Sequence, residues 1–282
     1  MRRLLILLLA LLVAGMAGLW LWRRADLGAD AREMRRLRAL QPEAPPLFDP
    51  AMVDGLPAPA RRYLLYAIRP GTPLYTVAEI EMTGRFGLGT RAAPRYLPMR
   101  AHQVLAPLDG FVWSMQAGAG LMQVSGSDSS QWSRFWLAGL LPVARAEADA
   151  DFSRSAFGRL VSEAVFWSPA SLLPGENVRW EAVDDARARV TIDYGDLQQT
   201  IEITVAEDGR ATQVVFARWS NANPEKRFQL QPFGGTLSDY AEVDGFRVPM
   251  RVEAGNFFGT PDYFPFFIAQ VRSIRFPRDG AS

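Results

Sequence analysis

The chain begins with a long apolar segment and changes later to alternating apolar and polar positions. Leu4 to Trp22 contains no charged residue, and two arginines flank it on each side. A helix of this length spans about 28 Å, close to the thickness of the hydrocarbon core of a bilayer. The pattern predicts a transmembrane anchor over residues 1–24.

A cleaved signal peptide is the alternative, because Gly15-Met16-Ala17 offers small residues where a signal peptidase cuts. The apolar region of a signal runs for about 7 to 15 residues, whereas Leu19 to Trp22 continue it here. Trp20 and Trp22 also lie beside arginines, as is typical of a membrane interface. We therefore expect an uncleaved anchor.

Two signals disagree about the side of the membrane. Six arginines occur between Arg23 and Arg38, and the positive-inside tendency would keep them cytoplasmic. Acidic residues are interleaved with these arginines, and the early span resembles a signal-anchor. We expect an extracytoplasmic domain on a single-pass protein of the cytoplasmic membrane, with the opposite orientation as the alternative.

Residues 25–50 predict a stalk and a proline-rich linker. Apolar residues continue at near-helical spacing: Leu27, Met34, Leu37 and Leu40. This spacing suits an amphipathic helix on a lipid surface, and a charged stalk in solvent is the alternative. Four prolines between Gln41 and Pro50 end any helix, so we expect the main domain to cover residues 51–282.

From Thr76 onward the pattern has a period of two, which predicts strands with one solvent-facing side. The predicted strands are 77–83, 99–105, 111–116, 121–125, 187–194, 197–205, 211–219, 228–233, 245–253 and 266–276. Short polar pairs such as Asp208-Gly209 and Asp244-Gly245 separate several of them and favour tight turns. An antiparallel meander is the expected topology.

Helical spacing is clear in one long segment, Asp151 to Trp167, which Ser168-Pro169 ends. A shorter helix is expected over Leu56 to Ile68. One main helix cannot cover about ten strands, so the sheet must close, curl around its apolar face or expose it. We predict an α+β fold that is mostly antiparallel β: a curved half-barrel sheet with one main helix, preceded by the transmembrane helix.

The composition excludes several functions. The chain has 282 residues, 49% of them hydrophobic, with a net charge of +1 and no cysteine. Disulfides and thiolate chemistry are therefore excluded, and no basic patch indicates nucleic acid.

The polar residues show no catalytic motif. His102 is the only histidine and no G-x-S-x-G motif accompanies it, so a structural or surface role is favoured. Glu79 and Glu81 share one strand face, which the alternation predicts to be the solvent face. We expect no metal, no cofactor and no enzymatic activity.

Several segments resemble an uncharacterised family of bacterial proteins. They are Arg159 to Pro174, Val178 to Asp185, Pro107 to Trp113 and Gly245 to Pro249. The resemblance covers about residues 55–278, and it implies no activity because the family is a domain of unknown function. The order of strands and helix is also similar to the half-barrel of LolA-type lipoprotein carriers, which implies a bent sheet that holds an acyl chain or a protein segment.

Aromatic residues are concentrated in two segments. The predicted ligand-binding aromatic residues are Trp132, Trp136, Phe257, Phe258, Tyr263, Phe264 and Phe266. Alternation cannot bury adjacent rings such as Phe257 and Phe258 on one sheet face. The rings either fill the ends of the core, line a hydrophobic pocket or contact a membrane or protein.

Arginines within strands supply candidate partners for an anionic head group, foremost Arg100 and Arg218. We predict a non-enzymatic protein that binds a hydrophobic or amphiphilic ligand, such as a lipid or acyl chain, at the membrane. The alternative is an envelope interaction or sensor module whose concave sheet binds a protein partner.

Overall fold

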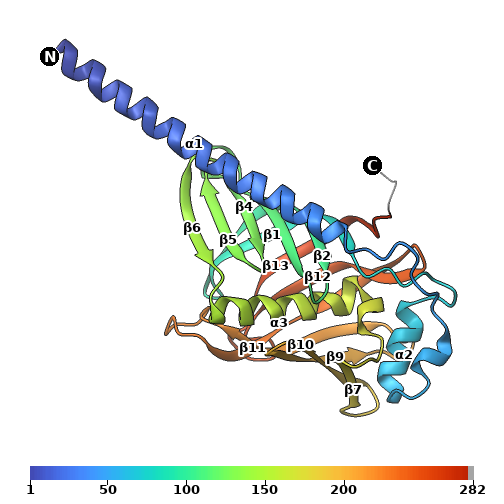
Figure 1. Ribbon diagram of the computed structural model, residues 1–282. Coiled ribbons are helices and arrows are strands. Elements are labelled where there is room, and N and C mark those ends of the chain that lie inside the picture. Colours follow the sequence, from blue (N-terminus) through green and yellow to red (C-terminus); the bar gives the residue numbers. More distant parts are fainter. Residues whose placement is uncertain (279–282) are drawn as a thin grey trace.

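The computed structural model describes residues 1–278 as a long helix joined to one curved sheet (Figure 1). The helices are α1 (Arg2–Arg38), α2 (Ala58–Ala67) and α3 (Ala150–Trp167), with shorter turns η1 (Pro50–Val53), η2 (Gly120–Met122) and η3 (Pro169–Leu172). The strands are β1 (Ala78–Thr90), β2 (Ala93–Ala106), β3 (Gly110–Ala117), β4 (Val124–Ser129), β5 (Trp132–Leu137), β6 (Leu141–Glu147), β7 (Val178–Ala182), β8 (Arg187–Tyr194), β9 (Leu197–Val205), β10 (Ala211–Ser220), β11 (Gln229–Val243), β12 (Phe246–Asn256) and β13 (Phe264–Arg275). Residues 279–282 of the predicted domain lie outside the described part.

The strands form a 13-stranded sheet in the order β6-β5-β4-β3-β2-β1-β13-β12-β11-β10-β9-β8-β7. Neighbouring strands are antiparallel throughout. Two meanders therefore run outward from the central β1–β13 pair, one to the edge strand β6 and one to the edge strand β7. The structure confirms the predicted α+β fold with an open, curved antiparallel sheet.

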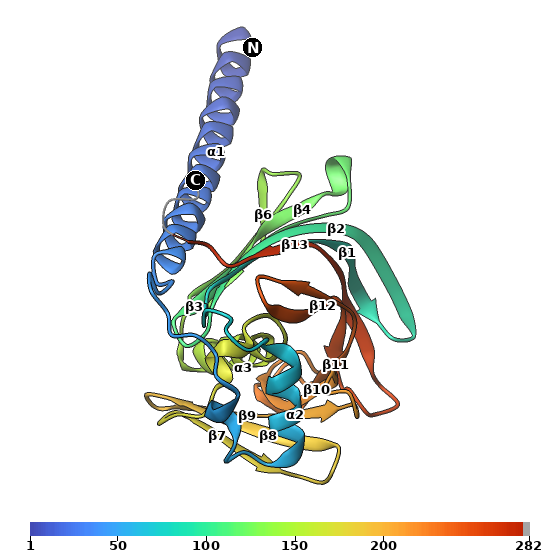
Figure 2. The same cartoon turned by 90° about the vertical axis from the view of Figure 1, so that its right-hand side faces the viewer.

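Helix α3 connects the two edge strands and lies in the hollow of the sheet (Figures 1 and 2). Its first turn is capped by Asp149, whose Oδ1 accepts a hydrogen bond from the backbone N–H of Phe152 at 2.7 Å. It contacts β3, β9, β10 and β12. Helix α2 covers a further part of the same face, at β7, β8, β9 and β12.

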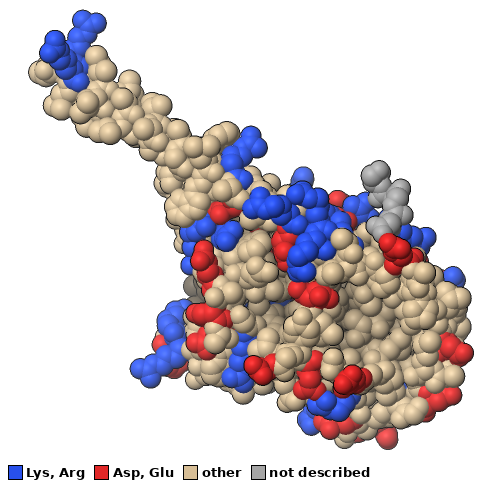
Figure 3. Space-filling view, in the orientation of Figure 1, with Lys and Arg blue, Asp and Glu red and all other residues tan. Residues whose placement is uncertain are grey.

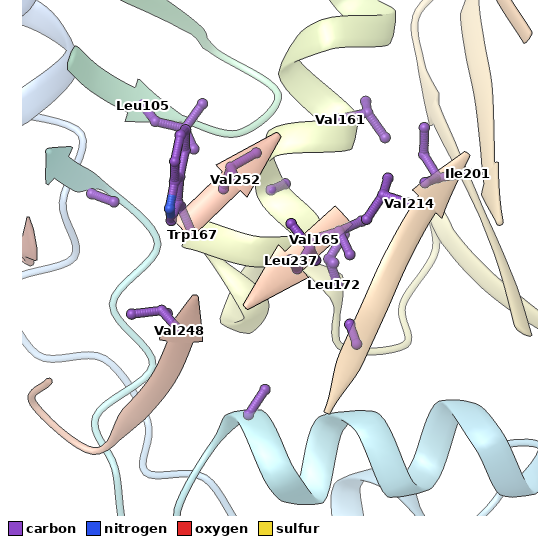
Figure 4. Packing of buried hydrophobic residues seen from close by; sticks show 14 of the residues in the cluster. Leu105, Val161, Val165, Trp167, Leu172, Ile201, Val214, Leu237, Val248 and Val252 are labelled. Carbon is purple, nitrogen blue, oxygen red and sulfur yellow. The ribbon is translucent and has the colours of Figure 1, made fainter. Parts of the chain in front are cut away.

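The core lies between α3 and the concave face of the sheet. Val161 and Val165 of α3 point toward the strands that carry Ile201 and Val214 (Figure 4). Ile201 and Val214 alternate with less buried residues along β9 and β10, as a half-buried sheet requires. Side chains of α3 and of the sheet itself thus fill most of the concave side of the curved sheet.

The second half of α1 packs against the outer face of the sheet. Met34 and Leu37 are buried against Val104 and Val112 of β2 and β3. These two helix residues therefore face the sheet, whereas Leu27 on the same helix and Leu40 just after its end are exposed. The structure therefore packs this part of the predicted stalk against the domain.

The first half of α1 makes no such contact. Helix α1 is the one helix in residues 1–278 that is long and apolar enough to cross a membrane, with a mean hydropathy of 2.7 over its most apolar window. In Figure 3 it projects from the domain, and basic side chains gather where the two meet.

Several strand predictions were wrong in their bounds. Residues 121–125 were predicted to be a strand, but η2 occupies Gly120–Met122 and β4 begins at Val124. The positive φ angles of Gly118 and Gly120, 80° and 58°, break the extended backbone there. Strands β5, β6 and β7 were not predicted. The adjacent rings Phe135 and Trp136 in β5 and Pro142 in β6 obscure the period of two, whereas β7 alternates but is only five residues long.

Candidate functional site

A cavity of about 280 Å³ lies between α3 and the concave face of the sheet. Its walls are mostly aromatic and aliphatic, and a few charged residues lie among them. The lining residues of ring type are Phe86, Trp113, Phe135, Phe166, Trp167, Phe216, Phe233, Phe266 and Phe267. A concave apolar space with a few polar groups is the usual form of a small-molecule site. The volume of this cavity lies just below the usual lower limit of about 300 Å³.

Helix α3 contributes one face to the cavity. Arg159, Glu163 and Phe166 follow one another at steps of three and four residues and therefore lie on one side of the helix. Leu160 and Val161, on the other side, are buried in the core. The same helix thus closes the core and supplies charge to the cavity.

An ion-pair cluster lies in the cavity wall. Arg159 lies between two carboxylates: its Nη1 is 2.5 Å from Asp128 Oδ2 and its Nε is 2.6 Å from Glu163 Oε1. The second oxygen of Glu163 accepts a hydrogen bond from Gln103 of β2. The Arg159 guanidinium also lies over the rings of Phe111 and Trp113, at 4.5 and 5.2 Å from their centroids. The charge of Arg159 is fully compensated.

Arg218 of β10 is the second arginine of the cavity wall and has no such partner. Within residues 1–278 it forms no ion pair within 4 Å, although Asp128 and Glu163 act on its charge from a longer distance, and its buried Nε has no hydrogen-bond acceptor. Its guanidinium lies over the ring of Phe233, 4.9 Å from the centroid. A cation in this position offers unused donors to a ligand.

The pKa values in the cavity reflect burial. Burial lowers the pKa of the Arg218 guanidinium to about 10, and the charge of Arg159 acts in the same direction. Burial raises the pKa of Asp128, against the opposing charges of Arg159 and Arg218. Both directions show that the charges in this wall are poorly solvated, and the carboxylates of Asp128 and Glu163 partly offset the effect of burial on Arg218.

Two of the predicted binding residues line this cavity, namely Arg218 and Phe266. Phe266 packs edge-on against Phe86 and Phe233, with centroid distances of 5.9 and 6.1 Å. The neighbouring Phe264 does not line the cavity and instead contacts Tyr96, at 5.8 Å. The role of these residues in binding stays a prediction.

The remaining predicted residues lie elsewhere. Phe257 occupies the turn after β12 with a φ of 60°, and Phe258 packs against Tyr263 in a T-shaped pair at 5.0 Å. Burial raises the pKa of Tyr263 to about 12. Arg100 is exposed on the outer face of β2.

Trp132 and Trp136 face α1 on the outer side of β5. The indole of Trp136 donates to Asp26 Oδ2 at 2.9 Å, and Trp132 packs with Met34 and Leu37. Phe135, between them in sequence, lines the cavity instead. Alternation along β5 therefore divides the predicted aromatic group between the two faces.

Apart from Arg218, the charged residues of the wall (Asp128, Arg159 and Glu163) were missed by the sequence reasoning. Arg159 and Glu163 carry a signal that could have found them: opposite charges four residues apart in an otherwise apolar helix segment. Asp128 carries none, because its strand is short and rich in serine and glycine.

The Glu79 prediction was wrong in one respect. Glu79 does lie on the face opposite to Ala78 and Ile80, but it is only 4% exposed. Arg38 at the end of α1 covers it, and His102 of β2 and Arg275 of β13 pair with the same carboxylate. Burial acts to raise the pKa of Glu79, but the bonds with His102 and Arg38 and the charges of Arg38 and Arg275 hold it well below its usual range.

His102 therefore lies on the outer face, away from the cavity, in contact with Glu79. Within the described chain, no three His, Asp or Glu side chains gather in a way that could hold a metal ion. The cavity can solvate an apolar chain and compensate one negative charge, and it presents no nucleophile activated by a base.

The fold and the cavity define a class of protein: an open antiparallel half-barrel with a helix in its concavity. The chain belongs to DUF6544, a family of unknown function, which it matches over residues 46–268. A search of curated proteins finds no similar sequence.

Solved structures include distant likenesses. The chain is similar to a LolA superfamily protein from Nitrosomonas europaea, with 8% identity, coverage of 78% of this chain and 92% of that chain, and a TM-score of 0.37. It is also similar to a DUF1329 family protein from Desulfovibrio piger, with 11% identity, coverage of 83% and 96%, and a TM-score of 0.40.

Proposed function

We propose that this protein is a membrane-anchored, non-enzymatic binding protein for a single-chain amphiphile with an anionic head group. The observation that carries the proposal is Arg218, an arginine without an ion-pair partner in the described chain, in the wall of an aromatic cavity of about 280 Å³. Its position supports a salt bridge to a ligand carboxylate or phosphate, while the rings solvate the chain.

The size of the cavity supports a compact ligand. At about 280 Å³ it suits one acyl chain better than a lipid with several chains, since drug-sized sites begin at about 300 Å³. The apolar first half of α1 supports an uncleaved anchor, which would hold the cavity close to a source of such amphiphiles. We propose the extracytoplasmic orientation for the domain, because acidic residues are interleaved with the arginines that follow the span.

Binding of a fluorescent fatty acid and of its neutral methyl ester tests this function. The full chain is placed in lipid nanodiscs, and empty nanodiscs give the background. We expect saturable binding of the acid, and weaker binding of the ester because it cannot pair with Arg218. Arg218→Met should weaken binding of the acid by about tenfold to a hundredfold, which corresponds to one charged hydrogen-bonded contact of roughly 1.5–3 kcal/mol, and leave the ester unchanged.

Arg100→Met is the matched control, because Arg100 is exposed on the opposite face of the sheet. It should bind the acid like the wild type, and Arg218→Lys should recover part of the affinity. An absence of saturable binding to the wild type, or equal affinities of the wild type and Arg218→Met, would contradict the proposal.

A further inference from the structure

Exposed apolar side chains gather at the tips of two hairpins beside α1. Leu121 and Met122 of η2 are 84% and 58% exposed, and Leu141 and Val143 of β6 are each 53% exposed. None of them has a place in the core or in the cavity. Contiguous exposed apolar side chains mark a surface that contacts another apolar phase or a partner.

The contacts of α1 place the β5–β6 tip level with the end of the apolar segment. A Cβ atom added to Gly139, in the turn of this hairpin, would lie 3.4 Å from the Arg23 guanidinium carbon. Arg23 is the first charged residue after the segment Leu4 to Trp22. Leu141 follows this turn directly and therefore lies near the same level.

The η2 tip reaches a similar level. Arg23 Nη2 donates to Ser125 Oγ at 3.0 Å, and Met122 precedes Ser125 by three residues toward the tip of the hairpin. In Figures 1 and 2 the hairpins that carry β4 and β6 point along α1 in the direction of its N-terminus. Both tips therefore extend toward the apolar half of the helix.

The helix is fixed rigidly at this level. The ring of Trp22 packs edge-on against Trp136, 5.5 Å between centroids, and the Arg145 guanidinium lies 4.5 Å from the Trp22 centroid. Asp26 accepts hydrogen bonds from Trp136 at 2.9 Å and from Arg145 at 2.7 and 3.1 Å. These contacts hold the hairpins in one orientation relative to the helix axis.

Tryptophan and arginine side chains together are typical of the head-group region of a bilayer. Trp20 lies beneath the Arg24 guanidinium, 5.0 Å from it, and the pair Trp22 and Arg145 lies next along the helix. The exposed apolar residues of the hairpin tips lie beside these pairs of tryptophan and arginine.

We infer that the tips 121–122 and 141–143 form a membrane-contact surface that enters the head-group region of the same bilayer that holds α1. The inference rests on the anchoring part of the proposed function. The occupant of the surface is phospholipid, because the surface continues the apolar segment of α1 and basic side chains border it. The domain then lies on the membrane through its sheet, and α1 sets its tilt.

Single-cysteine labelling tests the contact, since the chain has no cysteine of its own. Leu121→Cys and Leu141→Cys are labelled with an environment-sensitive fluorophore in the full chain, reconstituted in vesicles of phosphatidylethanolamine and phosphatidylglycerol. We expect blue-shifted emission, strong quenching by spin-labelled lipid and weak quenching by aqueous iodide. Leu230→Cys, 54% exposed, is the matched control and should show the reverse; it lies on β11, a strand on the far side of α3 from α1 (Figure 1).

Leu12→Cys, inside the apolar segment, separates the two possible failures. Lipid quenching at Leu12→Cys, combined with iodide quenching at Leu121→Cys and Leu141→Cys equal to that at Leu230→Cys, overturns the contact surface and leaves the anchor in place. Iodide quenching at Leu12→Cys as well overturns both the anchor and the surface that depends on it.

Discussion

The buried carboxylate of Glu79 should contribute strongly to stability, and its replacement by glutamine measures that contribution. Glu79 Oε1 lies 2.6 Å from His102 Nε2 and 2.5 Å from Arg38 Nη2, and Oε2 lies 3.0 Å from Arg275 Nη2. Glutamine keeps the shape but loses the charge, and it turns an amide N–H₂ toward cationic donors.

The magnitude follows from the exposure of the partners. Breaking a buried ion pair costs about 3–5 kcal/mol, mostly because one charge is left without compensation. Here the side chains left behind are 31%, 34% and 68% exposed for Arg38, His102 and Arg275, so water can hydrate them again. We therefore expect Glu79→Gln to lower the free energy of unfolding by about 2–3 kcal/mol.

Urea denaturation of the full chain in detergent, followed by tryptophan fluorescence, measures the change. Glu81→Gln is the matched control on the same face of the same strand, where Glu81 is exposed and bonds only Ser273 at 3.3 Å. It should change the free energy by less than about 0.5 kcal/mol. Equal effects of the two substitutions would refute the conclusion that α1 buries Glu79.

The pH dependence gives an independent check. Because the folded state holds the pKa of Glu79 below its ordinary value of 4.5, its stabilisation is fully present above about pH 4.5 and is lost as the pH falls toward the folded pKa. The difference in stability between the wild type and Glu79→Gln should therefore shrink in acid. A difference that is constant between about pH 7 and pH 3 would contradict this.

Two further substitutions test how the helices are held. Leu160→Ala on α3, where the side chain is 2% exposed, should cost about 2–5 kcal/mol in urea denaturation, because it leaves a cavity in the core; a loss below about 1 kcal/mol would show that α3 packs loosely. Asp26→Ala removes the bonds from Trp136 and Arg145 and should increase amide hydrogen exchange in residues 26–38. Glu33→Ala, whose ion pair with Arg36 stays within the helix, should leave that exchange unchanged, and equal exchange in both variants would exclude the proposed attachment.

Local patterns in the sequence were sufficient for the main helices, for most of the strands and for the class of fold. The apolar run from Leu4 to Trp22 predicts a long helix, and the spacing within Asp151 to Trp167 predicts α3 within one residue of its observed start. The period of two predicts antiparallel strands, because neighbouring side chains in a strand must face opposite sides.

The faces of individual residues depended on tertiary structure. Alternation places Glu79 opposite Ile80, but it cannot show that Arg38, 41 positions earlier, would cover the carboxylate. Alternation also separates Phe135 from Trp136, but only the position of α1 decides that Trp136 contacts Asp26 while Phe135 lines the cavity.

The cavity is the clearest case of this difference. Arg218 stands out in the sequence as an arginine within a strand, yet its lack of a partner depends on the pairing of Arg159 with both Asp128 and Glu163. Those three residues come from α3 and β4, on segments that only the curvature of the sheet brings near β10. The sequence by itself determined helices, strands and the apolar segment through local periodicity, whereas long-range packing decided which charges are compensated and which remain available to a ligand.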